Sequence, residues 1–66
     1  MLFKIGDRVQ YVGSGIFGAV GYELYNGDTL EVTEIWEDYS FPFGSTDRTG
    51  KIWFLCEEEL RLADDS

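Results

Sequence analysis

Several short stretches of the chain alternate between hydrophobic and polar residues with a period of two, which is the pattern of half-buried β-strands. In Arg8–Val12 the alternation places Val9 and Tyr11 on one face, and it recurs through Ala19–Tyr25. Gly13–Gly18, between these stretches, is predicted to be a flexible loop. Glycines at short intervals leave little room for a long amphipathic helix. The pattern therefore predicts an all-β fold.

The strongest turn signal is Asn26-Gly27-Asp28, because Asn and Gly tolerate the positive φ angles of a tight type I′ turn. It predicts a β-hairpin between Ala19–Tyr25 and a strand that begins at Thr29. Further along, Ser45–Gly50 has the composition of a polar turn. The elements expected after it are a strand over Lys51–Cys56, a 3₁₀ turn over Glu57–Glu59 and a closing strand over Leu60–Leu62.

The predicted strand Thr29–Asp38 contains a change of parity. Leu30 and Val32 share one face, but the next aliphatic residue, Ile35, falls on the other. A β-bulge near Thr33-Glu34 would return Ile35 to the core. In that register the last residues of the strand point outward and present a tryptophan flanked by acidic residues.

Both faces of the predicted strand Lys51–Cys56 are apolar. Its side chains divide into Ile52, Phe54 and Cys56 on one face and Trp53 and Leu55 on the other. Periodicity alone leaves open which of the two faces is buried.

The order of these elements resembles the SH3-like fold. The opening Gly-Asp-Arg-Val at residues 6–9 is similar to openings of SH3-like and KOW-type domains, and residues 49–54 with 58–60 resemble small SH3-like proteins of bacteriophages and prophages. The resemblance implies a small five-stranded SH3-like barrel with a 3₁₀ turn before the last strand. Residues 1–63 would form this single domain and residues 64–66 a frayed acidic tail.

The charge balance narrows the classes of partner. The 66 residues include 13 Asp and Glu against 5 Lys and Arg, a net charge of -8. Such a field repels the phosphate backbone of nucleic acids and anionic membrane surfaces, so we expect neither as a direct ligand. It suits a basic protein partner, and it also suits solubility alone. With one cysteine and no secretory or membrane-spanning stretch, we expect a cytoplasmic protein.

The residues needed for common catalytic chemistry are missing. The chain has no histidine, so Cys56 has no base to activate it, and Glu57–Glu59 would raise its pKa. We therefore interpret Cys56 as a small buried side chain. Gly13–Gly18 satisfies G-x-G-x-x-G, but that fingerprint requires a helix where a strand is predicted. We expect no enzymatic activity, no cofactor and no metal site.

One segment contains more large aromatic residues than the strand pattern needs, and acidic residues border it. Aromatic side chains are favoured anchors of protein interfaces, and acids steer a basic partner toward them. The alternative is that these rings cover an open end of the barrel. The candidate partner-binding residues are Glu34, Trp36, Glu37, Asp38, Tyr39, Phe41 and Phe43.

Three functions follow from these features. The first is a non-enzymatic protein-binding module, of the kind a phage or prophage accessory protein would use to engage a host protein. The second is a mimic of DNA whose carboxylates imitate phosphates, namely those of Glu31, Glu34, Glu37, Asp38, Glu57, Glu58 and Glu59. The third is a structural subunit or homo-oligomer built by pairing of strand edges, and the oligomeric state is left open.

Overall fold

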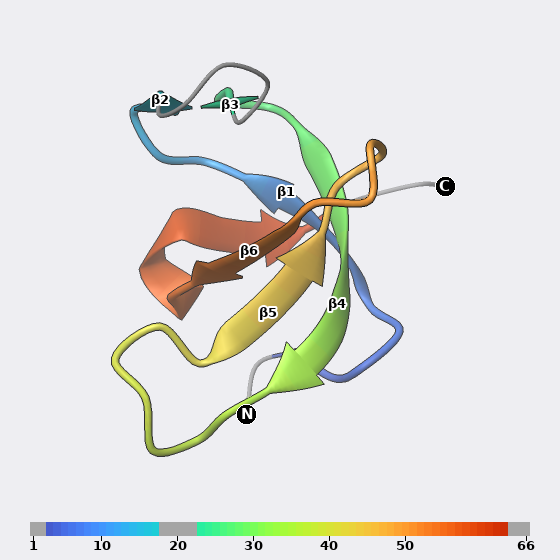
Figure 1. Ribbon diagram of the computed structural model, residues 1–66, viewed down its shortest axis with the longest axis vertical. Helices are drawn as coiled ribbons and strands as arrows, with labels where there is room; N and C mark the ends of the chain where they lie inside the picture. Colours follow the sequence, from blue (N-terminus) through green and yellow to red (C-terminus); the bar gives the residue numbers. More distant parts are fainter. Residues whose placement is uncertain (1–2, 18–22, 64–66) are drawn as a thin grey trace.

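The computed structural model describes residues 3–17 and 23–63, which form an all-β structure with a single 3₁₀ turn (Figure 1). A five-stranded antiparallel sheet has the order β6-β5-β4-β1-β7, and β2 and β3 form a separate two-stranded ladder. The elements are β1 (Arg8–Tyr11), β2 (Ile16–Phe17), β3 (Glu23–Leu24), β4 (Thr29–Ile35), β5 (Phe43–Thr46), β6 (Ile52–Leu55), the 3₁₀ turn η1 (Glu57–Glu59) and β7 (Leu60–Leu62).

The five-stranded sheet curls but does not close in the part of the chain that is described. Its edges, β6 and β7, each pair with one neighbouring strand, and β4 curves through the middle of the fold (Figure 1). The closed barrel that the sequence led us to expect is therefore not formed by these strands. The concave side of the sheet holds the core, whose buried hydrophobic side chains are Phe3, Val9, Tyr11, Leu24, Leu30, Val32, Phe43, Leu55 and Leu60.

The predicted β-bulge in the third long strand is confirmed. The pairing of β4 with β5 shifts register between Val32 and Glu34. Val32 is fully buried before the shift, and Ile35 packs against the core after it. The predicted 3₁₀ turn at Glu57–Glu59 and the final strand from Leu60 are also present.

The hairpin predicted at Asn26-Gly27 is wrong. β3 pairs with β2 and β4 pairs with β1, so this turn connects two different ladders. Its amide–carbonyl bond runs from Asp28 to Tyr25 at 3.0 Å, and φ is positive at Gly27 but not at Asn26. Positive φ at the third position alone is the pattern of a type II turn, whereas a type I′ turn requires it at both central residues.

Two other boundaries differ from the prediction. Ile16–Phe17 is a short strand inside the expected Gly13–Gly18 loop, and it pairs with Leu24 and Glu23. Phe43–Thr46 is a strand that includes the first two residues of the expected polar turn Ser45–Gly50, so the turn is shortened to Asp47–Gly50. Of the predicted strand Ala19–Tyr25, residues 19–22 lie outside the described ranges, as does the predicted tail at 64–66.

The structure decides which face of β6 is buried. Leu55 is buried and Trp53 is half-buried, while Ile52 and Phe54 are exposed on the opposite face. Within residues 3–17 and 23–63, no helix has the length and apolar character needed to cross a membrane.

Candidate functional site

The loop between β4 and β5, residues 36–42, is closed by two backbone hydrogen bonds. The Trp36 amide donates to the Pro42 carbonyl at 2.8 Å, and the Tyr39 amide donates to the Trp36 carbonyl at 3.0 Å. The first bond continues the pairing of β4 and β5 by one step, and the second makes a β-turn of residues 36–39. We call residues 36–42 the aromatic loop. The loop is held in position because both of its ends continue directly into paired strands.

Trp36 and Tyr39 form an exposed, stacked pair on this loop. Their ring centroids are 5.5 Å apart with an interplanar angle of 27°. The two side chains are 47% and 60% exposed. The Trp36 indole N–H also donates to the Glu34 carboxylate at 2.8 Å, which fixes the direction of the ring. Two large aromatic side chains are thus held in place without being buried.

The structure separates the predicted surface residues into two groups. Phe41 is 52% exposed and lies in the aromatic loop, together with Glu37 and Asp38, which are also exposed. Phe43 does not belong to this surface: it is buried in β5, with its ring edge-on to Phe3 at 5.1 Å. Phe43 is buried as a residue of β5 within the core, and not as a ring that covers an open end of a barrel.

Sequence reasoning missed Phe54 as a member of this surface. Glu34, Gly44 and Phe54 form one cross-strand row over β4, β5 and β6. A Cβ atom on Gly44 would lie 3.0 Å from the Glu34 Cβ and 3.0 Å from the Phe54 Cε1, so the ring of Phe54 extends across Gly44. The glycine opposite Phe54 is the sequence signal for this arrangement, but it is informative only once the register is known.

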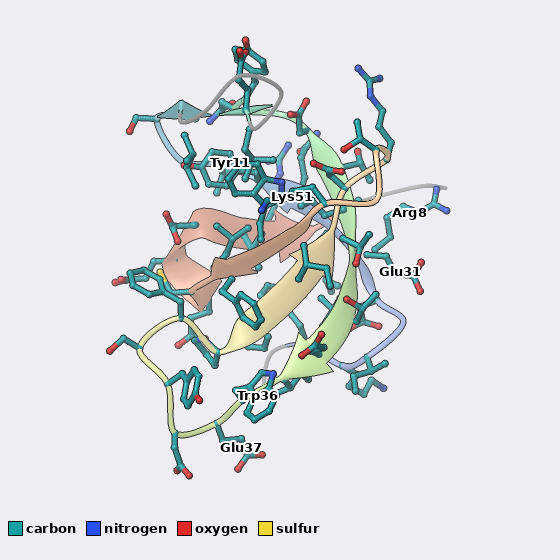
Figure 2. All side chains as sticks on the ribbon, in the orientation of Figure 1. Arg8, Tyr11, Glu31, Trp36, Glu37 and Lys51 are labelled. Carbon is teal, nitrogen blue, oxygen red and sulfur yellow. The ribbon has the colours of Figure 1, made fainter. Side chains whose placement is uncertain are left out.

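The charge around the aromatic loop is uniformly negative in sequence, since residues 34–43 include three acids and no Lys or Arg. Glu37 lies beside Trp36 at the end of β4, while Arg8 and Lys51 lie toward the other end of that strand (Figure 2). A cation approaching the aromatic loop therefore meets carboxylates first. This arrangement can attract a basic partner and hold it through apolar contact.

Two of the acidic residues outside the aromatic loop, Glu59 and Glu31, have neighbours within the fold. Glu59 accepts hydrogen bonds from the Cys56 amide at 3.2 Å and from its thiol at 3.4 Å, which caps η1. Glu31 lies opposite Arg8 in the β1–β4 ladder. DNA mimicry requires a surface of evenly spaced carboxylates that are not engaged within the fold. The positions of Glu59 and Glu31 reduce the area of such a surface on this protein.

Cys56 is half-buried next to η1. Burial raises the pKa of its thiol, and the hydrogen bond to Glu59 raises it further. A raised pKa leaves little thiolate near neutral pH, so the environment disfavours nucleophilic chemistry. Among residues 3–17 and 23–63 there is no group of three or more His, Cys, Asp or Glu side chains arranged to hold a metal ion.

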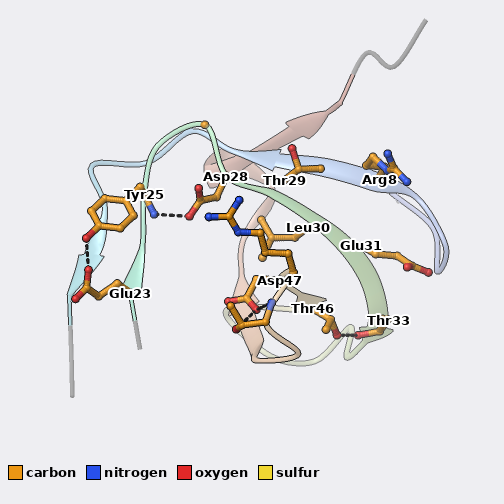
Figure 3. Close-up of a pocket in the computed structure, with 13 residues that line it drawn as sticks. Arg8, Glu23, Tyr25, Asp28, Thr29, Leu30, Glu31, Thr33, Thr46 and Asp47 are labelled. Carbon is orange, nitrogen blue, oxygen red and sulfur yellow. Dashed lines mark hydrogen bonds between the residues drawn. The ribbon is translucent and has the colours of Figure 1, made fainter. Parts of the chain in front are cut away.

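An open pocket of about 610 Å³ lies at the end of the sheet away from the aromatic loop, between the Tyr25–Asp28 turn and the Asp47–Gly50 turn (Figure 3). Several of its polar side chains are hydrogen-bonded to one another. The Tyr25 hydroxyl donates to Glu23, and the Thr33 and Thr46 hydroxyls are 2.9 Å apart. Hydrogen bonding to Glu23 raises the pKa of Tyr25.

Comparison with models of known protein families, with curated proteins and with solved structures found no match to this chain. The aromatic loop and its acidic border are the feature that the fold holds in place without using it for the core.

Proposed function

We propose that this protein is a non-enzymatic binding module that engages a basic partner protein through the aromatic loop. The observation that carries the proposal is the stacked Trp36–Tyr39 pair, which is ordered by backbone and side-chain hydrogen bonds and yet exposed. A rigid aromatic anchor loses little conformational entropy on binding, which is why such residues dominate the energetics of interfaces.

The chemistry of the partner follows from the acidic border. Glu37 and Asp38 lie in the same turn as the aromatic pair, and Glu34 contacts the indole N–H. Lys or Arg side chains of a partner would gain both from these carboxylates and from the exposed faces of Trp36 and Tyr39. Direct binding of nucleic acid is disfavoured by the net charge of -8.

We further propose that the fold is an open member of the SH3-like class and that the protein is a phage or prophage accessory protein. The order of the strands and the 3₁₀ turn before β7 support the first proposal. The second depends on the resemblance of residues 49–54 and 58–60 described above.

The test compares two aromatic substitutions of similar exposure. The immobilised protein is incubated with a lysate of its source organism, and captured proteins are quantified for the wild type, Trp36→Ala and Tyr25→Ala. Tyr25 is 49% exposed but precedes β4, whereas Trp36 follows it. We expect Trp36→Ala to reduce capture of a basic protein at least about tenfold, as for an interface anchor, and Tyr25→Ala to leave it unchanged. Equal loss in both variants would contradict the proposal.

The same experiment separates the two alternative functions. A DNA mimic would lose its partner in about 0.5 M salt and on neutralising Glu57 and Glu58, yet would tolerate Trp36→Ala. A homo-oligomer would capture only copies of itself and would show a multiple of the chain mass by light scattering. An anchored basic partner is expected to survive the Glu57 and Glu58 changes better than the Trp36 change.

A further inference from the structure

Among the strands of residues 3–17 and 23–63, β6 is an edge of the sheet, and one side of its backbone faces no neighbouring strand. The Asp47 amide donates to the Lys51 carbonyl at 2.9 Å, and the Gly50 amide donates to the Asp47 carbonyl at 3.0 Å, with φ at Gly50 of +93°. This is a three-residue hairpin with a glycine bulge. It makes Asp47–Lys51 the first hydrogen-bonded pair of the β5–β6 ladder.

Alternation along the ladder then fixes the direction of every backbone group in β6. Trp53 pairs with Ser45 and Leu55 pairs with Phe43, so the amides and carbonyls of Trp53 and Leu55 point toward β5. Those of Ile52 and Phe54 point to the open side. No other described strand pairs with β6. Two donors and two acceptors, two residues apart, thus face outward with the spacing that an added strand requires.

The side chains of β6 do not protect this edge. Ile52 and Phe54 are 38% and 46% exposed, and β6 contains neither a charged residue nor a proline. The opposite edge differs, because β7 is only three residues long and has Arg61 at its centre, bonded to Gln10 at 2.9 and 2.7 Å. Charged residues and short length are the usual protection of strand edges, and β6 lacks the first.

The open edge is continuous with the aromatic loop. The ring of Phe54 extends across Gly44 toward Glu34, and the Glu34 carboxylate accepts the Trp36 indole N–H. One surface therefore leads from the exposed aromatic pair, over a carboxylate, to the unpaired backbone of β6. A segment bound at the aromatic loop would have an edge strand within reach.

We propose that a basic, extended segment of the partner adds to β6 as a sixth strand of the sheet. The inference builds on the proposed function and names the conformation and charge of the bound segment. Its apolar side chains would pack on Ile52 and Phe54, and its Lys or Arg side chains would gain from Glu57 and Glu58, which follow the strand after Cys56. Backbone pairing supplies affinity and the alternate side chains supply selectivity.

Charge complementarity selects this occupant over a second copy of the chain. Pairing two copies through β6 would bring together two chains that each have a net charge of -8. The Lys51 ammonium does not offset this on the outer face, because it lies over the Trp53 ring at 5.8 Å, and Trp53 is on the opposite face from Phe54.

Amide hydrogen exchange tests the added strand residue by residue. The probe is a peptide of about six residues, a usual strand length, with alternating Val and Lys. We expect the peptide to slow exchange of the Ile52 and Phe54 amides at least about tenfold. The Trp53 and Leu55 amides, already bonded to β5, are internal controls and should not change. Unchanged exchange at Ile52 and Phe54 with saturating peptide would overturn the inference.

Two control peptides and one pair of variants sharpen the result. A Val–Glu peptide, and the Val–Lys peptide N-methylated at alternate residues, should give no protection. Ile52→Lys should weaken binding of the Val–Lys peptide at least about tenfold through like charge and loss of apolar contact. Ile5→Lys adds the same charge at a residue that is 66% exposed and outside β6, and should weaken it far less. Equal weakening by both variants would contradict edge binding.

Failure of this inference is distinguishable from failure of the proposed function. If the peptide shifts the Trp36 indole resonance but leaves Ile52 and Phe54 unprotected, the aromatic loop binds basic segments without strand addition, and only the inference fails. If Trp36→Ala captures the basic protein as well as the wild type does, the proposed function fails. Protection of Ile52 and Phe54 without peptide, together with a doubled mass, would replace the basic segment with a second copy.

Discussion

Trp36 in the aromatic loop and Trp53 in β6 make the same kind of hydrogen bond in different surroundings. Trp36 donates its indole N–H to Glu34 at 2.8 Å, and Trp53 donates its indole N–H to Asp47 at 2.8 Å. Trp36 is exposed, whereas Trp53 is half-buried and packs against the core. The indole–carboxylate bond therefore does not by itself indicate whether a tryptophan is structural or available to a partner.

The two sites differ in the other hydrogen bonds that the carboxylate accepts. Asp47 also accepts hydrogen bonds from the Thr49 amide at 2.8 Å, the Thr49 hydroxyl at 2.6 Å and the Lys51 amide at 3.1 Å. It thereby organises the whole β5–β6 turn. The Glu34 carboxylate, in contrast, accepts the indole N–H of Trp36 and organises no turn. One tryptophan is part of a turn network, and the other is oriented at the surface.

The largest expected effect is on stability, from truncating the two tryptophans. Trp53→Ala should lower the free energy of unfolding by about 2–4 kcal/mol, because it removes packing against the core and leaves a bond of Asp47 unmade. Trp36→Ala should lower it by no more than about 0.5 kcal/mol. Urea denaturation followed by far-ultraviolet circular dichroism measures both. Equal losses would show that the aromatic loop is structural after all.

Neutralising the Asp47 and Glu34 carboxylates should show the same contrast in stability, with smaller losses of unfolding free energy. Asp47→Asn replaces an acceptor of several hydrogen bonds with an amide that cannot accept them all, and we expect a loss of about 1–2 kcal/mol. Glu34→Gln retains an oxygen acceptor at the surface and should cost less than about 0.5 kcal/mol. Urea midpoints at neutral pH compare the two. A larger loss for Glu34→Gln would reverse the assignment of roles.

The pH dependence of stability isolates the contribution of Asp47. Burial by itself would raise the pKa of Asp47, but hydrogen bonds from Thr49, Trp53 and Lys51 lower it below its ordinary value of 3.8. The unfolded chain therefore takes up this proton first as the pH falls. The stabilisation is complete above the ordinary pKa and is lost as the pH falls through the lower pKa of the folded state.

Urea midpoints measured from about pH 6 down to about pH 2.5 test this difference for the wild type and Asp47→Asn. The gap between them should be constant in the upper part of the range and should narrow below about pH 4. Parallel profiles over the whole range would show that Asp47 is not the group responsible.

The smallest expected effect concerns the orientation of Trp36. Glu34→Ala removes the acceptor of its indole N–H, and water replaces it at little cost because the site is exposed. Stability should change by less than about 0.5 kcal/mol, while the indole N–H resonance should shift and broaden in NMR spectra. Trp53 provides the internal reference. An unshifted Trp36 resonance would mean that Glu34 does not set the direction of the ring.

Local sequence patterns predicted much of the sheet. The parity change between Val32 and Ile35 located the bulge, because only a register shift returns both side chains to one core. The same patterns failed at β5. Phe43–Thr46 includes a glycine and two hydroxyl residues, and the Ser45 side chain is fully buried with no hydrogen-bond partner among the described residues. A small polar residue inside the core gives no alternation to detect.

The candidate site was only partly predicted from the sequence, and the reason is related. The exposed tryptophan with its acidic neighbours followed from the bulge, and Trp36 is exposed beside Glu34. Phe43 was predicted to lie on the surface because its neighbours in sequence are aromatic residues of the loop. Its pairing with β6 instead directs its side chain into the core. Phe54 was missed because both faces of its strand are apolar.

The sequence by itself determined the all-β class, the acidic charge, the absence of histidine, the bulge and the 3₁₀ turn, since each depends on residue type or on spacing within a few positions. The tertiary structure decided the partner of each strand, the buried face of β6 and the open edge that it leaves. These features depend on contacts between residues that are distant in the chain. The local conformational preferences of the residues are nearly equal for the alternative pairings and faces. That is why two similar tryptophans have opposite surroundings.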